Sequence, residues 1–271
     1  MAHVQPIQVG RFQVTTICEG FAPLPLADEM PGEPVDWDGE RAAHPWAFFG
    51  SDAWPWHVHA FLVETPDGVV LVDTGTGPFG PYRPWADADA GAWSRVDPAD
   101  VDHVVLTHLH ADHAGGVEVS ALVPRFPNAA YHLHPSDLRH FESVHPDAYV
   151  AVKPAQRLEE LGVLRMRDAN HDVAPGVRVI HAPGHTPGHR AVLLRDAGHG
   201  LVLTGDLLHH PTQAAHPMSP SSHDEDALLG VASRRLLLWR AHTNGWRVGV
   251  PHFAHPFGRV TTAGWESASS A

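Results

Sequence analysis

The chain has 271 residues, which suffice for one large hydrophobic core or two small ones. Its hydrophobic content of 43% is that of an ordinary globular protein in water. The formal net charge of -13 argues against nucleic acids and anionic membrane surfaces as partners. Histidine is the unusual component, because its 24 residues outnumber the 18 lysines and arginines together.

The first residues of the chain and its cysteine content indicate the cellular compartment in which we expect the protein. Residues 1–11 have no basic stretch followed by an apolar one, so they predict no secretory signal. No apolar run approaches the roughly 20 residues that a membrane-spanning helix needs. The single cysteine, Cys18, excludes an intrachain disulfide. We therefore expect a cytoplasmic protein without a membrane partner.

The predicted elements alternate between strands and helices. A break at Gly10 divides the first strand region, and residues 65–68 form a turn between two strands. In chain order, the patterns predict strands at 7–19, 58–64, 69–73 and 101–107; a helix that opens at 112–119; a strand at 129–134; helices at 135–141 and 154–161; strands at 177–181, 191–195 and 201–204; a helix at 224–241; and strands at 248–250 and 259–263. We expect the tail at 264–271 to be frayed.

The helix predicted at 224–241 is the longest, and an apolar stripe runs along it. The stripe consists of Leu228, Leu229, Val231, Ala232, Leu236 and Trp239. No internal repeat or low-complexity linker interrupts the alternation of strands and helices. We therefore predict one α/β domain that spans residues 1–271.

Residues 22–56 differ from the rest of the chain. They are rich in proline and acidic residues, and their aromatic side chains show no clear periodicity. These aromatic residues are Trp37, Trp46, Phe48, Phe49, Trp54 and Trp56. A long irregular segment of this kind is either a lid over a site or a contact with another subunit. An extension that packs on its own domain is an equal alternative.

Four candidate metal ligands lie within six residues, in the block HLHADH at 108–113. They are His108, His110, Asp112 and His113. Zinc binds imidazole nitrogen and carboxylate oxygen at about 2.0–2.2 Å, usually with tetrahedral geometry. One ion cannot use all four side chains and keep an open position for a substrate. Alternate residues of an extended segment face the same way, so we predict two neighbouring ions, with one pair of side chains for each.

Three more polar side chains follow apolar strands and complete the candidate site. His185 lies in a turn-rich loop after one strand, Asp206 follows another, and His252 follows a third. Open α/β sheets place their sites at such strand ends. His255 could compete with His252, but the position at the strand exit favours His252.

Four motifs resemble those of a known superfamily. The block at 108–113 matches the HxHxDH motif of the metallo-β-lactamase superfamily, and LVDTG at 71–75, PGHTPGH at 183–189 and TGD at 204–206 match its other motifs in order. The resemblance covers about 58–260 and implies an αβ/βα four-layer sandwich with a dinuclear site between the sheets. Residues 206–211 and 251–258 are similar to methyl parathion hydrolase-like and quorum-quenching lactonase-like members.

The resemblance implies two ligand sets around two divalent ions, which we expect to be Zn²⁺. The first set consists of His108, His110 and His185, and the second consists of Asp112, His113 and His252. Asp206 bridges the two ions. Asp112 and Asp206 are also expected to orient the nucleophile and accept its proton.

Two departures from the superfamily narrow the expected function. Penicillin-degrading members have cysteine or a non-ligand where Asp206 stands, so we do not expect β-lactamase action. The best-known lactonases have a tyrosine three residues after the bridging aspartate, where this chain has His209. This replacement leaves the substrate-contacting group open, and we expect His209 to line the pocket and take part in catalysis.

The remaining polar candidates receive smaller roles. Asp73 is expected to accept the second N–H of a ligand histidine, with a plain turn residue as the alternative. No role is assigned to His189. The residues expected to be strand positions without function are His57, His59, His132 and His134.

The expected function is hydrolysis of a lactone or another ester by a hydroxide that bridges two ions. Phosphotriester or aryl-ester hydrolysis is the alternative within the same fold. A mononuclear iron sulfur dioxygenase and a histidine-rich metal-storage protein are two further hypotheses. The expected partner is a small-molecule substrate, and exposed aromatic residues at 22–56 would be compatible with a homodimer.

Overall fold

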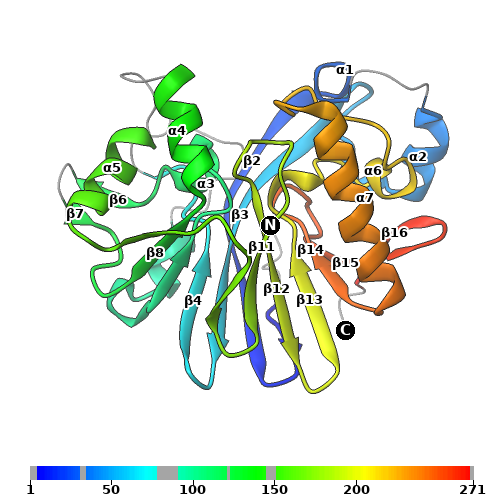
Figure 1. The fold of residues 1–271 in the computed structure, drawn as a ribbon. Coiled ribbons are helices and arrows are strands. Elements are labelled where there is room, and N and C mark those ends of the chain that lie inside the picture. Colours follow the sequence, from blue (N-terminus) through cyan, green and yellow to red (C-terminus); the bar gives the residue numbers. More distant parts are fainter. Residues whose placement is uncertain (1–4, 31–34, 78–90, 121–122, 145–150, 269–271) are drawn as a thin grey trace.

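The computed structural model describes residues 5–30, 35–77, 91–120, 123–144 and 151–268. In these residues, two seven-stranded sheets pack face to face, and helices cover the outer face of each sheet (Figure 1). This arrangement is the αβ/βα four-layer sandwich, so the predicted fold class is confirmed.

The first sheet has the strand order β1-β2-β3-β4-β5-β8-β9. Its strands are β1 (Ile7–Val9), β2 (Phe12–Pro25), β3 (Ala53–Thr65), β4 (Gly68–Val72), β5 (His103–Val105), β8 (Ala130–Leu133) and β9 (Leu164–Met166). Strands β1 to β4 pair antiparallel, whereas β4, β5, β8 and β9 run parallel. The carboxyl ends of β4 and β5 therefore meet at one edge, where Asp73 and the 108–113 block follow.

The second sheet has the order β10-β11-β12-β13-β14-β15-β16. Its strands are β10 (His171–Ala174), β11 (Val177–His181), β12 (Arg190–Asp196), β13 (His199–Leu203), β14 (Arg247–Gly249), β15 (Phe257–Thr261) and β16 (Gly264–Ser267). Only β13 and β14 pair in parallel among these described strands. Their carboxyl ends lead to Asp206 and His252, which are thereby brought to the same edge.

Helices and short turns connect the strands. They are α1 (Leu26–Glu29), α2 (Trp37–Ala43), η1 (Pro45–Ala47), η2 (Ala92–Arg95), η3 (Pro98–Asp100), α3 (Ala111–Ala114), α4 (Pro135–Val144), α5 (Val152–Glu160), η4 (Gly205–Leu207), α6 (Thr212–Ala215) and α7 (Ala227–Thr243). A small hairpin of β6 (Glu118–Ser120) and β7 (Val123–Pro124) follows α3. In Figure 1, α4 and α5 lie outside the first sheet and α7 lies outside the second.

Three apolar layers hold the sandwich together. Alternate strand residues such as Val63 and Val192 meet between the two sheets. Leu138 of α4 and Leu158 of α5 pack on the first sheet, and Leu237 of α7 packs on the second. Full burial of such a side chain contributes about 1.5–3 kcal/mol.

The helix predicted at 112–119 is wrong beyond its first turn, because α3 ends at Ala114. The N–H of Gly116 donates to the carbonyl oxygen of Gly75 at 3.1 Å. A Cβ atom on Gly116 would lie only 2.1 Å from the carbonyl oxygen of Thr74. The chain leaves the helix here because the backbone after β4 packs directly against it.

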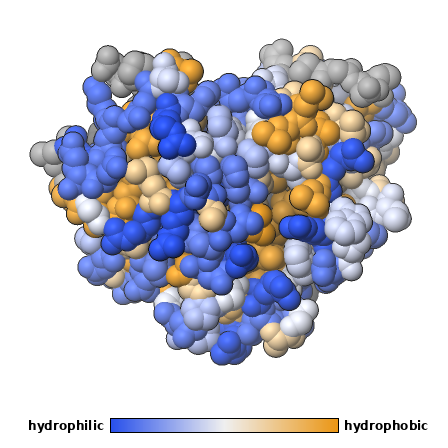
Figure 2. Space-filling view, in the orientation of Figure 1, coloured by the Kyte–Doolittle hydropathy of each residue, from blue (hydrophilic) through white to orange (hydrophobic). Residues whose placement is uncertain are grey.

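The apolar stripe predicted on the long helix lies mostly on its exposed side. Leu228 and Trp239 are 84% and 60% exposed, and hydrophobic residues gather on the surface over α7 in Figure 2. The buried face consists of Gly230, Val231, Arg234, Leu237, Leu238 and Ala241, so it shares Val231 with the stripe and includes an arginine. No helix in the described part of the chain is long and apolar enough to cross a membrane.

The two ends of the last region also differ from the prediction. α7 begins at Ala227 because the side chain of Asp226 accepts the N–H of Leu229. The tail predicted to be frayed forms β16, since Trp265 is 5% exposed and packs edge-on against Phe253. Residues 269–271 lie outside the described residues.

The segment at 22–56 is more regular than predicted, because it contains the end of β2, helices α1 and α2, and the start of β3. Residues 31–34 lie outside the described residues. The rings of Trp37, Phe48 and Trp54 surround His210, with centroid distances of 5.1–5.9 Å. The segment is thus attached to the chain that follows Asp206. Its role as lid or subunit contact stays a prediction.

Arg234 links α7 by hydrogen bonds to the part of the chain that follows Asp206. It is 0% exposed, and its guanidinium donates to the carbonyl oxygens of Leu207 and Ser219. It also lies 3.3 Å from a carboxylate oxygen of Asp224. These contacts explain why a charged side chain is stable in the core.

Arg234→Met is therefore expected to lower the free energy of unfolding by about 3–5 kcal/mol, because it leaves Asp224 as an unpaired buried charge. The neighbouring Arg235 is exposed, and Arg235→Met should change this free energy by no more than about 0.5 kcal/mol. Urea denaturation of both variants measures the difference. Equal and small losses would contradict the role of Arg234.

Candidate metal centre

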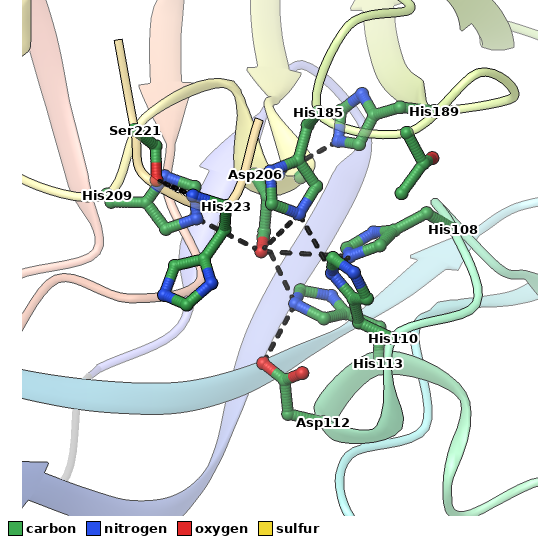
Figure 3. Close-up of polar contacts among 12 residues, drawn as sticks. His108, His110, Asp112, His113, His185, His189, Asp206, His209, Ser221 and His223 are labelled. Carbon is green, nitrogen blue, oxygen red and sulfur yellow. Dashed lines mark hydrogen bonds and ion pairs between the residues drawn. The ribbon is translucent and has the colours of Figure 1, made fainter. Parts of the chain in front are cut away.

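Asp206 lies at the centre of a group of histidines that come from both sheets (Figure 3). It follows β13 in η4, and it is 3% exposed. Five imidazole Nε2 atoms surround its carboxylate: those of His113 (3.0 Å) and His252 (3.1 Å) near Oδ1, and those of His185 (3.3 Å), His209 (3.3 Å) and His108 (3.7 Å) near Oδ2.

One group of ligand atoms gathers on the Oδ2 side of Asp206. It consists of His108, His110, His185 and Asp206, whose ligand atoms lie within 4.8 Å of one another. Nδ1 of His110 lies 2.9 Å from Nε2 of His108 and also 2.9 Å from Nε2 of His185. Tetrahedral zinc would hold such nitrogens about 3.3 Å apart. The three imidazoles are therefore close to the spacing that one ion requires.

A second group gathers on the Oδ1 side and consists of Asp112, His113, Asp206 and His252, all of them buried. Oδ2 of Asp112 lies 3.1 Å from Nε2 of His113 and 3.8 Å from Nε2 of His252. The structure thus brings the seven predicted ligands together in the two predicted sets, with Asp206 common to both. Their role as metal ligands stays a prediction.

Asp73 orients two of these histidines from the end of β4, as predicted. Its carboxylate accepts the Nδ1–H of His113 at 2.8 Å. It also accepts the hydroxyl hydrogen of Thr107 at 2.9 Å, so that the Thr107 oxygen can accept the Nδ1–H of His108 at 3.0 Å. Both rings therefore turn their Nε2 atoms toward Asp206.

Two other contacts orient His185 and His252 in the same way. Nδ1 of His185 lies 3.4 Å from Oδ1 of Asp224, and Nδ1 of His252 donates to the carbonyl oxygen of His57 at 2.7 Å. A neutral imidazole carries a proton on one nitrogen and a lone pair on the other. In their neutral form, with Nδ1 carrying the proton, these four imidazoles turn an Nε2 lone pair toward the carboxylate of Asp206.

Lone pairs and carboxylate oxygens repel one another unless positive charge lies between them. Among the described residues, the buried atoms without a well-aligned hydrogen-bond partner include Nε2 of His113, Nε2 of His252, Oδ1 of Asp206 and Oδ2 of Asp112. Burial disfavours the charged form of His113, but the carboxylates around it outweigh burial and raise its pKa. Burial likewise opposes the charge of Asp206, yet the surrounding histidines lower its pKa. The centre attracts positive charge, and its donor set fits divalent ions.

His209 lines this centre, as predicted. Its Nε2 lies 3.3 Å from Oδ2 of Asp206, and its ring stacks on that of His252 with centroids 5.5 Å apart. The alternative ligand His255 is exposed and packs edge-on against Trp46. His255 therefore takes no place in the groups around Asp206.

His189 has a positioning role that the sequence analysis does not assign. Its Nδ1 donates to the carbonyl oxygen of Ala182 at 3.0 Å, and its Nε2 accepts the backbone N–H of Asp206 at 2.9 Å. It thereby links the loop of His185 to Asp206. The signal that could have revealed it is the repeat in PGHTPGH at 183–189, which ends in a second histidine.

Asp137 is a second positioning residue that the sequence analysis omits. It is 0% exposed at the start of α4. Its Oδ2 accepts the N–H of Leu109 at 3.0 Å, and its Oδ1 accepts the hydroxyl of Thr186 and the N–H of Gly188, both at 2.7 Å. Burial raises the pKa of Asp137 to about 6 against these hydrogen bonds. One carboxylate thus joins the two loops that carry the histidines.

The rim of the centre combines apolar and charged groups. The rings of Trp56 and His252 have centroids 5.1 Å apart. His223 lies beside His209 in Figure 3, with ring centroids 6.2 Å apart. Its Nε2 lies 3.1 Å from the buried carboxylate of Glu29, and this hydrogen bond raises the pKa of His223. The ring of Trp56 and an imidazole whose charged form is favoured by Glu29 therefore border the same centre.

Comparison with known proteins places this architecture in a family. Residues 53–236 match the family model described as the metallo-beta-lactamase superfamily. An N-acyl homoserine lactonase of Bacillus sp. is 29% identical over 168 residues, which cover 54% of this chain. The chain spans 61% of the length of that lactonase.

Two solved structures share the fold over nearly the full length. A hydrolase named AbOPH, described as a member of the beta lactamase superfamily, has a TM-score of 0.83 with 23% identity and covers 100% of this chain and 99% of its own. AidC, a dizinc quorum-quenching lactonase in complex with a product, has a TM-score of 0.81 with 20% identity and covers 99% and 98%. At these identities the likeness establishes the fold.

Asp137→Asn keeps the shape of the side chain but replaces an acceptor oxygen by a donor group. At least one N–H or hydroxyl of the two histidine loops then loses its acceptor. We expect the free energy of unfolding to fall by about 1–3 kcal/mol, because an unsatisfied buried donor costs about that much. We also expect bound divalent ions to be lost at lower chelator concentrations.

The matched control is Asp226→Asn at the N-terminus of α7, where asparagine caps a helix as well as aspartate does. Urea denaturation and chelator titration should leave this control close to wild type. Equal behaviour of the two variants in both measurements would contradict the clamping role of Asp137.

Proposed function

The chain belongs to the metallo-beta-lactamase superfamily, and from that membership we propose that it is a dinuclear metal-dependent hydrolase of lactones or other esters. The observation that carries the proposal is the placement of imidazole Nε2 atoms on both sides of the buried carboxylate of Asp206. Separate groups of candidate ligands stand at its two oxygens. A shared carboxylate between two ligand sets favours two ions over one.

We assign the first ion to His108, His110 and His185, the second to Asp112, His113 and His252, and Asp206 to both. Two divalent ions, which we expect to be Zn²⁺, would supply a bridging hydroxide at neutral pH and polarise the attacked carbonyl. Oδ2 of Asp112 and Oδ1 of Asp206 have no well-aligned hydrogen-bond partner among the described residues. These oxygens would bind the ions, and we propose that the two carboxylates also orient the nucleophile and accept its proton.

His209 is the proposed substrate contact. Its Nε2 lies close to Asp206, and its Nδ1 is buried without a hydrogen-bond partner among the described residues. An imidazole in this position can donate to the oxygen that becomes negative in the transition state. No serine or cysteine nucleophile is required.

Lactones are the first choice of substrate for two reasons. The relatives reported above include proteins named as lactonases. In addition, Trp56 beside His252 offers an apolar surface for an acyl or aryl group. Phosphotriester or aryl-ester hydrolysis is the alternative, since the same centre suits an attacked phosphorus.

Initial rates on acyl-homoserine lactones, aryl esters and a paraoxon-like triester separate these substrates. We expect the highest kcat/KM on a lactone with a long acyl chain, because the apolar wall binds the chain. A higher kcat/KM on the triester would favour the alternative. Equal and feeble rates on every substrate would contradict both.

Asp206→Ala is expected to reduce turnover to the uncatalysed rate and to lower the metal content, because the variant loses the carboxylate that the two sets share. His209→Ala should keep the metal content of the wild type and lower kcat/KM about a hundredfold, as expected for the loss of one transition-state hydrogen bond. Metal analysis, circular dichroism and kinetics of both variants give the comparison. Persistent turnover in Asp206→Ala with wild-type metal content would refute the bridging role.

The remaining hypotheses predict different metals. A mononuclear iron sulfur dioxygenase would bind one iron and consume oxygen, so metal analysis and an oxygen electrode distinguish it. A metal-storage protein would need no fixed ligand geometry. The contacts of Asp73, Asp137 and His189 fix the orientation of the candidate ligands, which favours a catalytic site.

A further inference from the structure

A second group of candidate ligands lies on the strand pair β2–β3. Cys18 of β2 pairs with His59 of β3, and His57 projects from the same face two residues earlier. Sγ of Cys18 lies 3.8 Å from Nδ1 of His57. Each of the three residues offers a ligand atom within 4.8 Å of the others, and none belongs to the groups around Asp206.

His59 holds a buried lone pair that the described residues leave unused. It is 2% exposed, and its Nε2 lies 2.9 Å from the carbonyl oxygen of Phe253. Because a carbonyl only accepts, Nε2 carries the proton and Nδ1 carries the lone pair. Nδ1 has no hydrogen-bond partner among the described residues. Metal-bound histidines commonly show this arrangement, with the second nitrogen donating to a backbone carbonyl.

His57 lies beside both other residues of this group. It is 5% exposed, and its ring stacks on that of His59 with centroids 5.3 Å apart. Its Nδ1 faces Sγ of Cys18, and imidazole nitrogen and thiolate sulfur are both ligands of zinc.

We propose that Cys18, His57 and His59 bind a further cation of the thiophilic class to which Zn²⁺ belongs. Thiolate and imidazole ligands select such ions, whereas Mg²⁺ and Ca²⁺ prefer oxygen. Tetrahedral zinc with its usual bond lengths would place the sulfur and a nitrogen about 3.6 Å apart, close to the 3.8 Å between Cys18 and His57. Cys18 is partly exposed, so solvent can reach a fourth position.

The cation site lies directly behind a ligand of the dinuclear centre. The backbone N–H of His57 donates to the carbonyl of His252 at 3.3 Å, and the carbonyl of His57 accepts Nδ1–H of His252 at 2.7 Å. A cation on the His57 side chain restrains the backbone that orients His252. The two sites share no ligand, so this ion has a structural role and takes no part in the hydrolysis.

Cobalt provides a direct test, because Co²⁺ occupies zinc sites and its bond to thiolate gives a charge-transfer band in the near ultraviolet. Cys18 is the only cysteine in the chain, so this band can arise only there. The apoprotein is loaded with excess Co²⁺, and absorption and bound cobalt are measured after desalting. We expect the band in the wild type and its absence in Cys18→Ser, with one cobalt ion fewer per chain.

Two further measurements test whether the thiolate band comes from the proposed site. His59→Gln keeps the thiol of Cys18. Near-complete loss of the thiolate band in this variant would show that cobalt binds at the three-residue site and not nonspecifically to the thiol. An undiminished band in this variant would overturn the proposed site. Cys18→Ser should keep the d–d absorption of the dinuclear centre, because the two sites share no ligand.

The outcomes separate this site from the proposed function. Wild-type protein that binds cobalt without a thiolate band refutes the Cys18 site and leaves the dinuclear hydrolase intact. A thiolate band that depends on both Cys18 and His59 supports the site even where no ester is hydrolysed, which would contradict the proposed function alone.

Discussion

The buried carboxylate of Asp206 is the constraint on which the rest of the structure depends. Imidazole nitrogens stand 3.0–3.7 Å from its oxygens, and such a group is stable only when positive charge neutralises it, because an unpaired buried ion costs several kcal/mol. Asp206 follows a strand of one sheet, whereas His108 and His113 follow a strand of the other. The packing of the two sheets therefore also determines the charge balance of the centre. Any change that separates the sheets also separates the candidate ligands.

A second set of carboxylates holds the ligands in place from outside. Asp73 orients His113, Asp224 lies against His185, and Asp137 joins the two histidine loops. Each of these carboxylates also contacts backbone groups or another side chain, so the protein itself fixes the direction of the rings. This arrangement buries acidic groups around the centre, and bound divalent ions would offset part of the net charge of -13.

The predictable part of the site is the part that is local in the sequence. The block at 108–113 contains four candidate metal ligands within six residues. The end of the strand before it is predicted from a few apolar residues. Asp137 bonds to Leu109, which lies 28 residues earlier, and His189 bonds to the backbone of Asp206, 17 residues later. Backbone partners leave no mark in the sequence, so a lone aspartate at a helix start resembles an ordinary cap. The buried face of α7 is not evident from the sequence for a related reason: Arg234 is buried because carbonyl oxygens that only the fold brings to it accept its N–H groups.

The segment at 22–56 lies beside the candidate metal centre but supplies none of its candidate ligands. Nε2 of His210 donates to the carbonyl oxygen of Ala47, and aromatic rings of the segment pack around the same imidazole. His210 directly follows His209, so the segment packs against the residue next to the proposed substrate contact. Trp56, at the other end of the segment, reaches the ring of His252. The wall of the site is thus built from chain that supplies no member of the two ligand groups around Asp206. In the proposed hydrolase, changes in that wall would alter which ester fits without changing the two ligand groups, which is how one fold can serve several substrates.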